Sequence, residues 1–78
     1  MPTILRIGAY RFFFFAGGLG EPAHVHIERE DKIAKFWLCP VRLHNSGGFS
    51  RQEISRLSAL VLEYQAHLME AWNDYFHD

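Results

Sequence analysis

Two histidines separated by one residue, His24 and His26, are the side chains whose types and spacing best suit chemistry in this sequence. Residues at i and i+2 of a β-strand point to the same face, so a strand here would project both imidazoles side by side. Histidine titrates near neutral pH, so one ring can act as general base and the other as general acid across a phosphodiester. The same spacing would also let both rings bind one metal ion. The alternative is a structural role for both as half-exposed strand residues.

Basic and aromatic side chains elsewhere in the first half suit the binding of phosphate groups and bases. Arg6 and Arg11 are expected opposite each other across a hairpin, and a bound anion such as phosphate would relieve this like-charge pair. Alternatively, the guanidinium groups extend into solvent or pair with nearby acids. Lys35 would add a third cation, and Trp37 would stack on a base.

The first of the elements that position these residues is a β-hairpin. Strands are predicted at 4–7 and 10–15, and the intervening Gly8-Ala9 suits a two-residue turn because glycine tolerates positive φ at the first central position. The register set by this turn pairs Ile7 with Tyr10, Arg6 with Arg11 and Leu5 with Phe12.

A second hairpin is predicted from strands at 24–29 and 33–38 around Glu30-Asp31-Lys32. Period-two alternation places one apolar set on the core face: Val25, Ile27, Ala34, Phe36 and Leu38. The expected register on the other face sets Glu28 opposite Lys35, His26 opposite Trp37, and His24 near Cys39. The two histidines are therefore expected to point away from the helix. Residues 41–43, after Pro40, fit a short fifth strand.

Residues 50–77 are predicted to form one long helix, and the apolar pattern permits a break near Glu63 without requiring one. Ser50-Arg51-Gln52-Glu53 has the form of a capping box, and apolar residues recur every three or four positions from Ile54 to Tyr75. A helix of about 25 residues rises roughly 38 Å, which is longer than the sheet needs. The distal residues Trp72, Tyr75 and Phe76 are therefore expected to form the contact of a homo-oligomer.

Composition predicts a single folded domain over residues 1–78, with hairpins in 1–45 and the helix in 50–77. The chain has 78 residues, 49% of them hydrophobic, and a net charge of -1, which excludes a second domain and argues against disorder. One cysteine cannot form an internal disulfide. No apolar run reaches about twenty residues and no signal peptide is evident, so we expect a cytoplasmic protein with no membrane partner. The expected fold class is α+β, with an antiparallel sheet packed on the helix.

The sequence also resembles a small bacterial family, domain of unknown function 4160. The resemblance covers nearly the whole chain and is carried by Met1-Pro2-Thr3-Ile4, Tyr10-Arg11-Phe12-Phe13-Phe14, Glu21-Pro22-Ala23-His24-Val25-His26, Ala34-Lys35-Phe36-Trp37-Leu38 and Ala71-Trp72-Asn73-Asp74-Tyr75-Phe76. It implies a component of a toxin–antitoxin pair, encoded beside another small protein. Only the motif positions His24 and His26 are carried over from the family, and Cys39 stands where an acid is more usual.

These observations favour a toxin-like component of a bacterial toxin–antitoxin module that binds or cleaves RNA through the H-x-H strand face. His24 and His26 would be the catalytic pair, and the substrate-binding residues would be Arg6, Arg11, Lys35 and Trp37. As an enzyme it would be a metal-independent ribonuclease without a cofactor. Its partners would be RNA, a small cognate protein encoded nearby, and a second copy of itself.

Two other classes of function stay open. The first is a non-catalytic module that oligomerises or binds a partner protein through its aromatic C-terminus. The second is a small metal-binding domain that uses His24 and His26, with Glu28 or Cys39 as a further ligand.

Overall fold

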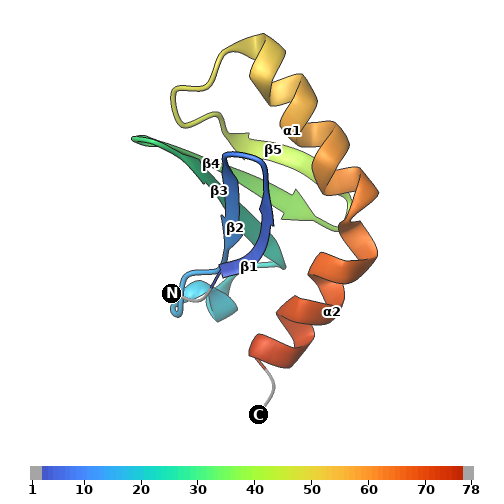
Figure 1. Cartoon of the computed structure of the whole chain (residues 1–78). Coiled ribbons are helices and arrows are strands. Elements are labelled where there is room, and N and C mark those ends of the chain that lie inside the picture. Colours follow the sequence, from blue (N-terminus) through green and yellow to red (C-terminus); the bar gives the residue numbers. More distant parts are fainter. Residues whose placement is uncertain (1–2, 77–78) are drawn as a thin grey trace.

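A computed structural model describes residues 3–76, apart from the side chain of Leu19. Within these residues, five strands form one antiparallel sheet in the order β1-β2-β3-β4-β5, and two helices cover one of its faces (Figure 1). The elements are β1 Thr3–Ile7, β2 Tyr10–Phe13, β3 His24–Arg29, β4 Lys32–Leu38, β5 Val41–Asn45, α1 Arg51–Glu63 and α2 Gln65–Tyr75, with a 3-10 turn at Gly18–Gly20. The α+β class and the antiparallel sheet are confirmed.

The first hairpin has the predicted register. Ile7 pairs with Tyr10, Arg6 with Arg11 and Leu5 with Phe12. Gly8 adopts φ +56°, as the tight turn requires. Strand β2 ends at Phe13, two residues earlier than predicted, and the next side chain, Phe14, is fully buried beneath aromatic rings of α2.

The second hairpin keeps the predicted faces but not the predicted register. Its turn contains only Glu30 and Asp31, because Glu30 takes φ +57° and β4 already begins at Lys32. The pairing therefore slips by two residues: His24 lies opposite Trp37, His26 opposite Lys35, and Glu28 opposite Ile33. A slip of two leaves every side chain on its original face, which is why the apolar set still lines the core. Strand β5 extends to Asn45, two residues beyond the predicted end.

The prediction of one long helix was wrong, and the break lies next to Glu63, where the apolar pattern permitted one. The chain leaves helical geometry at Tyr64, with φ -103° and ψ 15°, and α2 then continues in a new direction around the sheet (Figure 1). The side-chain amide of Gln65 donates to the Leu38 carbonyl at 2.6 Å, which ties the break to the end of β4. The predicted start is confirmed: Ser50 Oγ accepts a hydrogen bond from the Glu53 backbone amide at 3.1 Å. Neither α1 nor α2 has the length and apolar character needed to cross a membrane.

The break lets both helices bury their apolar stripe within one chain. Leu57 and Val61 of α1 and Leu68 and Trp72 of α2 all lie in the core. Trp72 is only 7% exposed and contacts the Phe14 ring, with 5.2 Å between ring centroids. The distal aromatic residues therefore do not overhang the sheet, and the helix length that suggested an oligomer contact there is absorbed by the fold.

Candidate nucleic-acid interface on the open face of the sheet

The face of the sheet opposite the helices carries most of the residues that the sequence singled out. We call it the open face; Arg6, Arg11, His26, Glu28, Lys35, Trp37, Arg42 and His44 lie on it. Strand alternation places them there, because their neighbours in β2, β3 and β4 face the core. The loop containing the Gly18–Gly20 turn and Glu21 lies at one end of this face.

His24 is buried where the open face meets α2. Its side chain is 2% exposed, and its Nδ1 donates to the Pro22 carbonyl at 2.8 Å. Its ring centroid lies 5.0 Å from the ring of Trp72, so the prediction that both histidines point away from the helix was wrong for His24. The Gly18 turn closes over the same ring, because a Cβ on Gly18 would come within 3.1 Å of it.

His26 lies beside His24, with 5.4 Å between the ring centroids, and is half-buried among aromatic rings. It stacks on Phe13 and meets the edge of Phe15, and its Nδ1 is buried without a hydrogen-bond partner among the described residues. The pKa of His26 is lowered from 6.5 to about 4, chiefly by burial of the ring and in smaller part by electrostatic repulsion from His24 and Lys35, against the opposing effect of Glu21. This ring is therefore neutral at neutral pH.

Lys35 and Trp37 lie next to the histidines on β4. The Lys35 ammonium donates to Glu21 at 2.6 Å and lies 4.8 Å from the centre of the Trp37 ring. The hydrogen bond from Lys35 also lowers the pKa of Glu21. The side chains of Lys35 and Trp37 therefore hold each other in place without a ligand.

The two arginines of the first hairpin differ in their surroundings. Arg11 donates to Glu28 at 3.0 Å and to Thr3 at 2.7 Å, and its guanidinium lies 4.5 Å above the Phe13 ring. Glu28 thus neutralises one member of the like-charge pair, and Arg11 is braced across three strands. Arg6, on the outer strand, is exposed.

Ring contacts run without interruption from Phe15, just after β2, across β3, β4 and β5. Phe15 meets His26, His26 meets His24, His24 meets Trp37, and Trp37 meets His44 on β5 with 4.9 Å between ring centroids. His44 and Arg42 are the functional candidates that the sequence reasoning missed. Their signal was present, because alternation in a fifth strand beside β4 places both on the face of Trp37.

The residues suggested as metal ligands are not brought together in the described part of the chain. Within residues 3–76, no group of three or more His, Cys, Asp or Glu side chains is positioned to hold an ion. The two suggested additional ligands lie elsewhere: Glu28 binds Arg11, and Cys39 is exposed in the turn between β4 and β5.

Comparison with known proteins yields a family but no function. Neither a curated protein nor a solved structure matches the chain significantly. A family model described as a domain of unknown function, DUF4160, matches residues 9–73. This match spans most of the sequence, including the H-x-H strand, β4 and nearly all of both helices. The chain therefore belongs to the DUF4160 family.

Proposed function

We propose that the protein binds single-stranded RNA on the open face of its sheet. The observation that carries the proposal is the line of rings from Phe15 to His44, with the exposed cations Arg6 and Arg42 on the two outer strands. Unpaired bases stack on aromatic side chains, and antiparallel sheet surfaces are a common platform for this contact. Phe15 is 38% exposed, and Trp37 and His44 also reach the surface.

The cations suit a phosphate backbone that crosses the strands. Arg6 on β1 and Arg42 on β5 are four strand spacings apart, about 19 Å, a distance that several nucleotides would span. Lys35 and Arg11 lie between them, held by Glu21 and Glu28. They would contribute positioned donors, whereas the outer arginines would supply most of the salt-dependent attraction.

Binding, rather than cleavage, is the part of the RNA hypothesis that the geometry supports. A general acid must hold a proton at neutral pH and reach the substrate. His26 has a pKa of about 4, and His24 is 2% exposed with Nδ1 engaged by Pro22. Both rings fit a role as supports that set the positions of Phe15 and Trp37.

The cellular role that we propose for this binding is that of the toxin-like component of a bacterial toxin–antitoxin module, with a small protein encoded nearby as its partner. The resemblance of the sequence motifs supports this role, and the RNA surface offers a means of inhibiting translation. Expression of the chain alone should slow bacterial growth, and co-expression of the neighbouring protein should restore it. Unimpaired growth at high expression would contradict the toxin role without affecting the RNA-binding proposal.

Fluorescence anisotropy with a labelled single-stranded RNA of mixed sequence tests the binding. Phe15→Ala should weaken binding about 5- to 50-fold, because one stacked base contributes about 1–3 kcal/mol. Arg42→Glu should weaken it and reduce the slope of log K against log salt by about one.

Two matched controls lie on the helical side of the molecule. Leu62→Ala removes a side chain that is 59% exposed on α1, and Arg51→Glu reverses an exposed charge at the start of α1. Both should leave the RNA affinity unchanged. Absence of binding at low salt, or equal losses in the open-face and control variants, would refute the proposal.

A further inference from the structure

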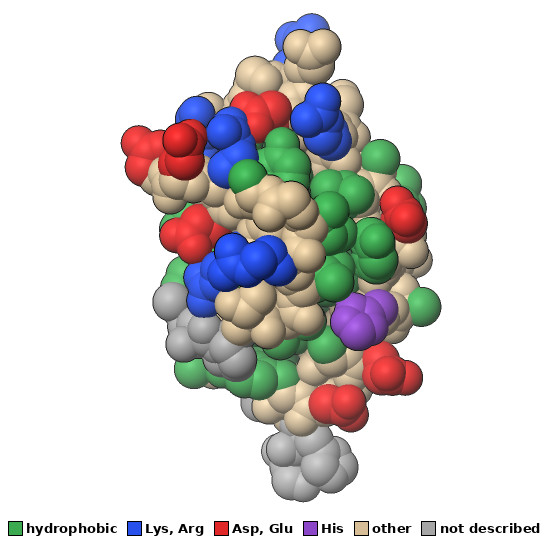
Figure 2. Space-filling model, in the orientation of Figure 1, with side chains coloured by type: hydrophobic (Ala, Val, Ile, Leu, Met, Phe, Trp, Pro, Cys, Tyr) green, Lys and Arg blue, Asp and Glu red, His purple; other side chains and the backbone are tan. Residues whose placement is uncertain are grey.

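A groove runs between the outer strand β1 and the two helices. Figure 2 shows hydrophobic side chains exposed along the middle of this side of the molecule. Two hollows of about 570 and 410 Å³ lie along the groove, the first beside α1 and the second beside α2. Its apolar lining includes Ile4, Ile7, Leu60, Ala71 and Tyr75. We call this surface the β1–helix groove.

Strand β1 is open to further pairing along the groove. It is the first strand in the sheet order, so its outer edge has no neighbouring strand among the described residues. Edge strands are commonly protected by proline, lysine, a β-bulge or a covering element. Strand β1 has an irregularity between Thr3 and Leu5, but its part from Leu5 to Ile7 pairs regularly with β2 and carries one charged residue, Arg6, on the open face. The edge can therefore accept another strand while the groove accepts apolar side chains.

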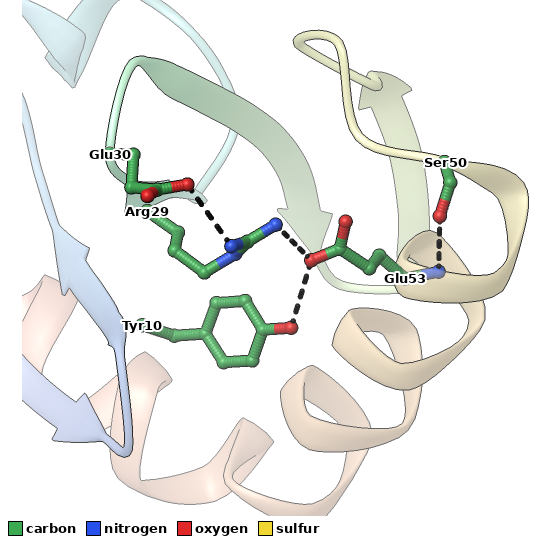
Figure 3. A network of polar contacts seen from close by, with 5 residues as sticks. All are labelled: Tyr10, Arg29, Glu30, Ser50 and Glu53. Atoms are coloured by element: carbon green, nitrogen blue, oxygen red, sulfur yellow. Dashed lines mark hydrogen bonds and ion pairs between the residues drawn. The ribbon is translucent and has the colours of Figure 1, made fainter.

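The two ends of the groove carry opposite charges. At the α1 end, Glu53 accepts hydrogen bonds from Arg29 at 2.6 Å and from Tyr10 at 3.2 Å (Figure 3), so the charges of Arg29 and Glu53 offset each other. Arg56, exposed at this end, has no ion-pair partner within residues 3–76.

The α2 end is acidic. Asp74 lines the second hollow and is exposed, and among the described residues it forms no ion pair. Because Arg56 and Asp74 lie at opposite ends of the groove, the groove has a positive end and a negative end.

We propose that the occupant of the β1–helix groove is a second copy of this chain, related by a two-fold axis. In such an isologous dimer, β1 pairs antiparallel with the partner's β1, and Arg56 faces the partner subunit's Asp74 at both ends. The two-fold axis makes the grooves of the two copies run in opposite directions, so the positive end of each groove meets the negative end of the other. The aligned edges would extend the sheet from five strands to ten, with both open faces on one side.

The register of the strand pairing follows from Arg6. A two-fold axis at Arg6 would set this cation against its own copy, which is unfavourable. An axis at Leu5 keeps the two Arg6 side chains from lying directly opposite each other and brings the two Leu5 side chains together on the helix side of the sheet, beside the groove. The interface differs from the one expected from the sequence, because it uses the edge strand and the sides of both helices instead of the buried Trp72.

Charge reversal with mixing tests the proposal by sedimentation velocity or light scattering. Arg56→Glu and Asp74→Arg should each weaken self-association at least tenfold, because each homodimer would bring like charges together twice. An equimolar mixture of the two variants should form a heterodimer of near wild-type affinity, because every facing pair is again of opposite charge. Arg51→Glu, another exposed arginine on α1, is the matched control and should remain dimeric.

Circular dichroism of each variant shows whether it folds, and the charge-neutral variants Arg56→Gln and Asp74→Asn should weaken the dimer by a smaller factor. A wild-type chain that stays monomeric at 100 µM would overturn the proposal. So would a dimer that both reversals leave intact, or variants that do not associate with each other when mixed. No RNA is present in this experiment, so its result is independent of the proposed RNA binding.

Discussion

Lowering the pH from 7 to 5 should destabilise the folded protein through His26. In the unfolded chain this imidazole takes up a proton near its ordinary pKa of 6.5, whereas in the folded state its pKa is about 4 because the ring is partly buried between Phe13 and Phe15. Between these two values the unfolded state binds more protons than the folded state. The free energy of unfolding therefore falls as the pH falls through this window. The stability that depends on a neutral His26 is fully present only above pH 6.5.

The size of this effect follows from the two pKa values. With these two pKa values, the linkage relation gives a loss of about 2 kcal/mol in the free energy of unfolding between pH 7 and pH 5. The ring retains some contact with solvent, which screens the interactions of the charged form, so we expect about 1 kcal/mol. Glu21 also has a lowered pKa, but its contribution is lost below its usual 4.5, outside this window.

Urea denaturation at pH 5, 6 and 7 measures the effect. His26→Gln removes the titrating group and should flatten the pH dependence by about 1 kcal/mol relative to wild type. His67→Gln, an exposed histidine on α2, is the matched control and should keep the wild-type dependence. The reasoning is refuted if the wild-type and His26→Gln proteins lose the same free energy of unfolding between pH 7 and pH 5.

Two further predictions concern stability. Trp72→Ala should cost about 3–5 kcal/mol in urea denaturation, because Trp72 is 7% exposed and fills the space between Phe14 and His24, whereas Leu62→Ala, at a site 59% exposed, should change stability by less than about 0.5 kcal/mol. Equal losses in these two variants would contradict the described core. Gly47→Ala should destabilise far more than Gly8→Ala: both residues have positive φ, but a Cβ on Gly47 would lie 1.8 Å from the Ile33 carbonyl oxygen, whereas one on Gly8 meets no atom within 4 Å. Thermal unfolding compares them, and similar melting temperatures would show that the backbone near Ile33 is placed differently.

The local elements were predictable because their signals are short in range. Glycine at a two-residue turn sets the first hairpin and its register, and Ser50 with Glu53 marks the start of α1. Alternation separates the core face from the open face, and a slip of two residues in the second hairpin does not disturb that separation. The slip itself was not predictable, because it depends on Glu30 adopting a positive φ that this residue type rarely takes.

The candidate site was also predictable only in part: the face of each residue follows from the sequence, but the ion pairs do not. Alternation alone placed His26, Lys35 and Trp37 on one face. It also places on that face Arg42, inside the predicted fifth strand, and His44, one residue beyond its predicted end. The neutralising partners Glu21 and Glu28 come from a loop and a neighbouring strand, and their approach to Lys35 and Arg11 depends on the register. Which cations are available to a ligand is therefore a property of the assembled sheet.

The amino-acid sequence by itself determined the α+β class, the antiparallel hairpins and the face on which each strand residue lies, because these follow from periodicity and turn chemistry between near neighbours. Only the tertiary structure decided the burial of His24, the break at Tyr64 and the position of Trp72. No glycine or proline marks the break; it arises where Gln65 binds the Leu38 carbonyl and the helix must follow the sheet. Burial of His24 beneath Trp72 and the Gly18 turn joins residues distant in the chain, and such contacts are selected by packing of the whole core rather than by any local pattern.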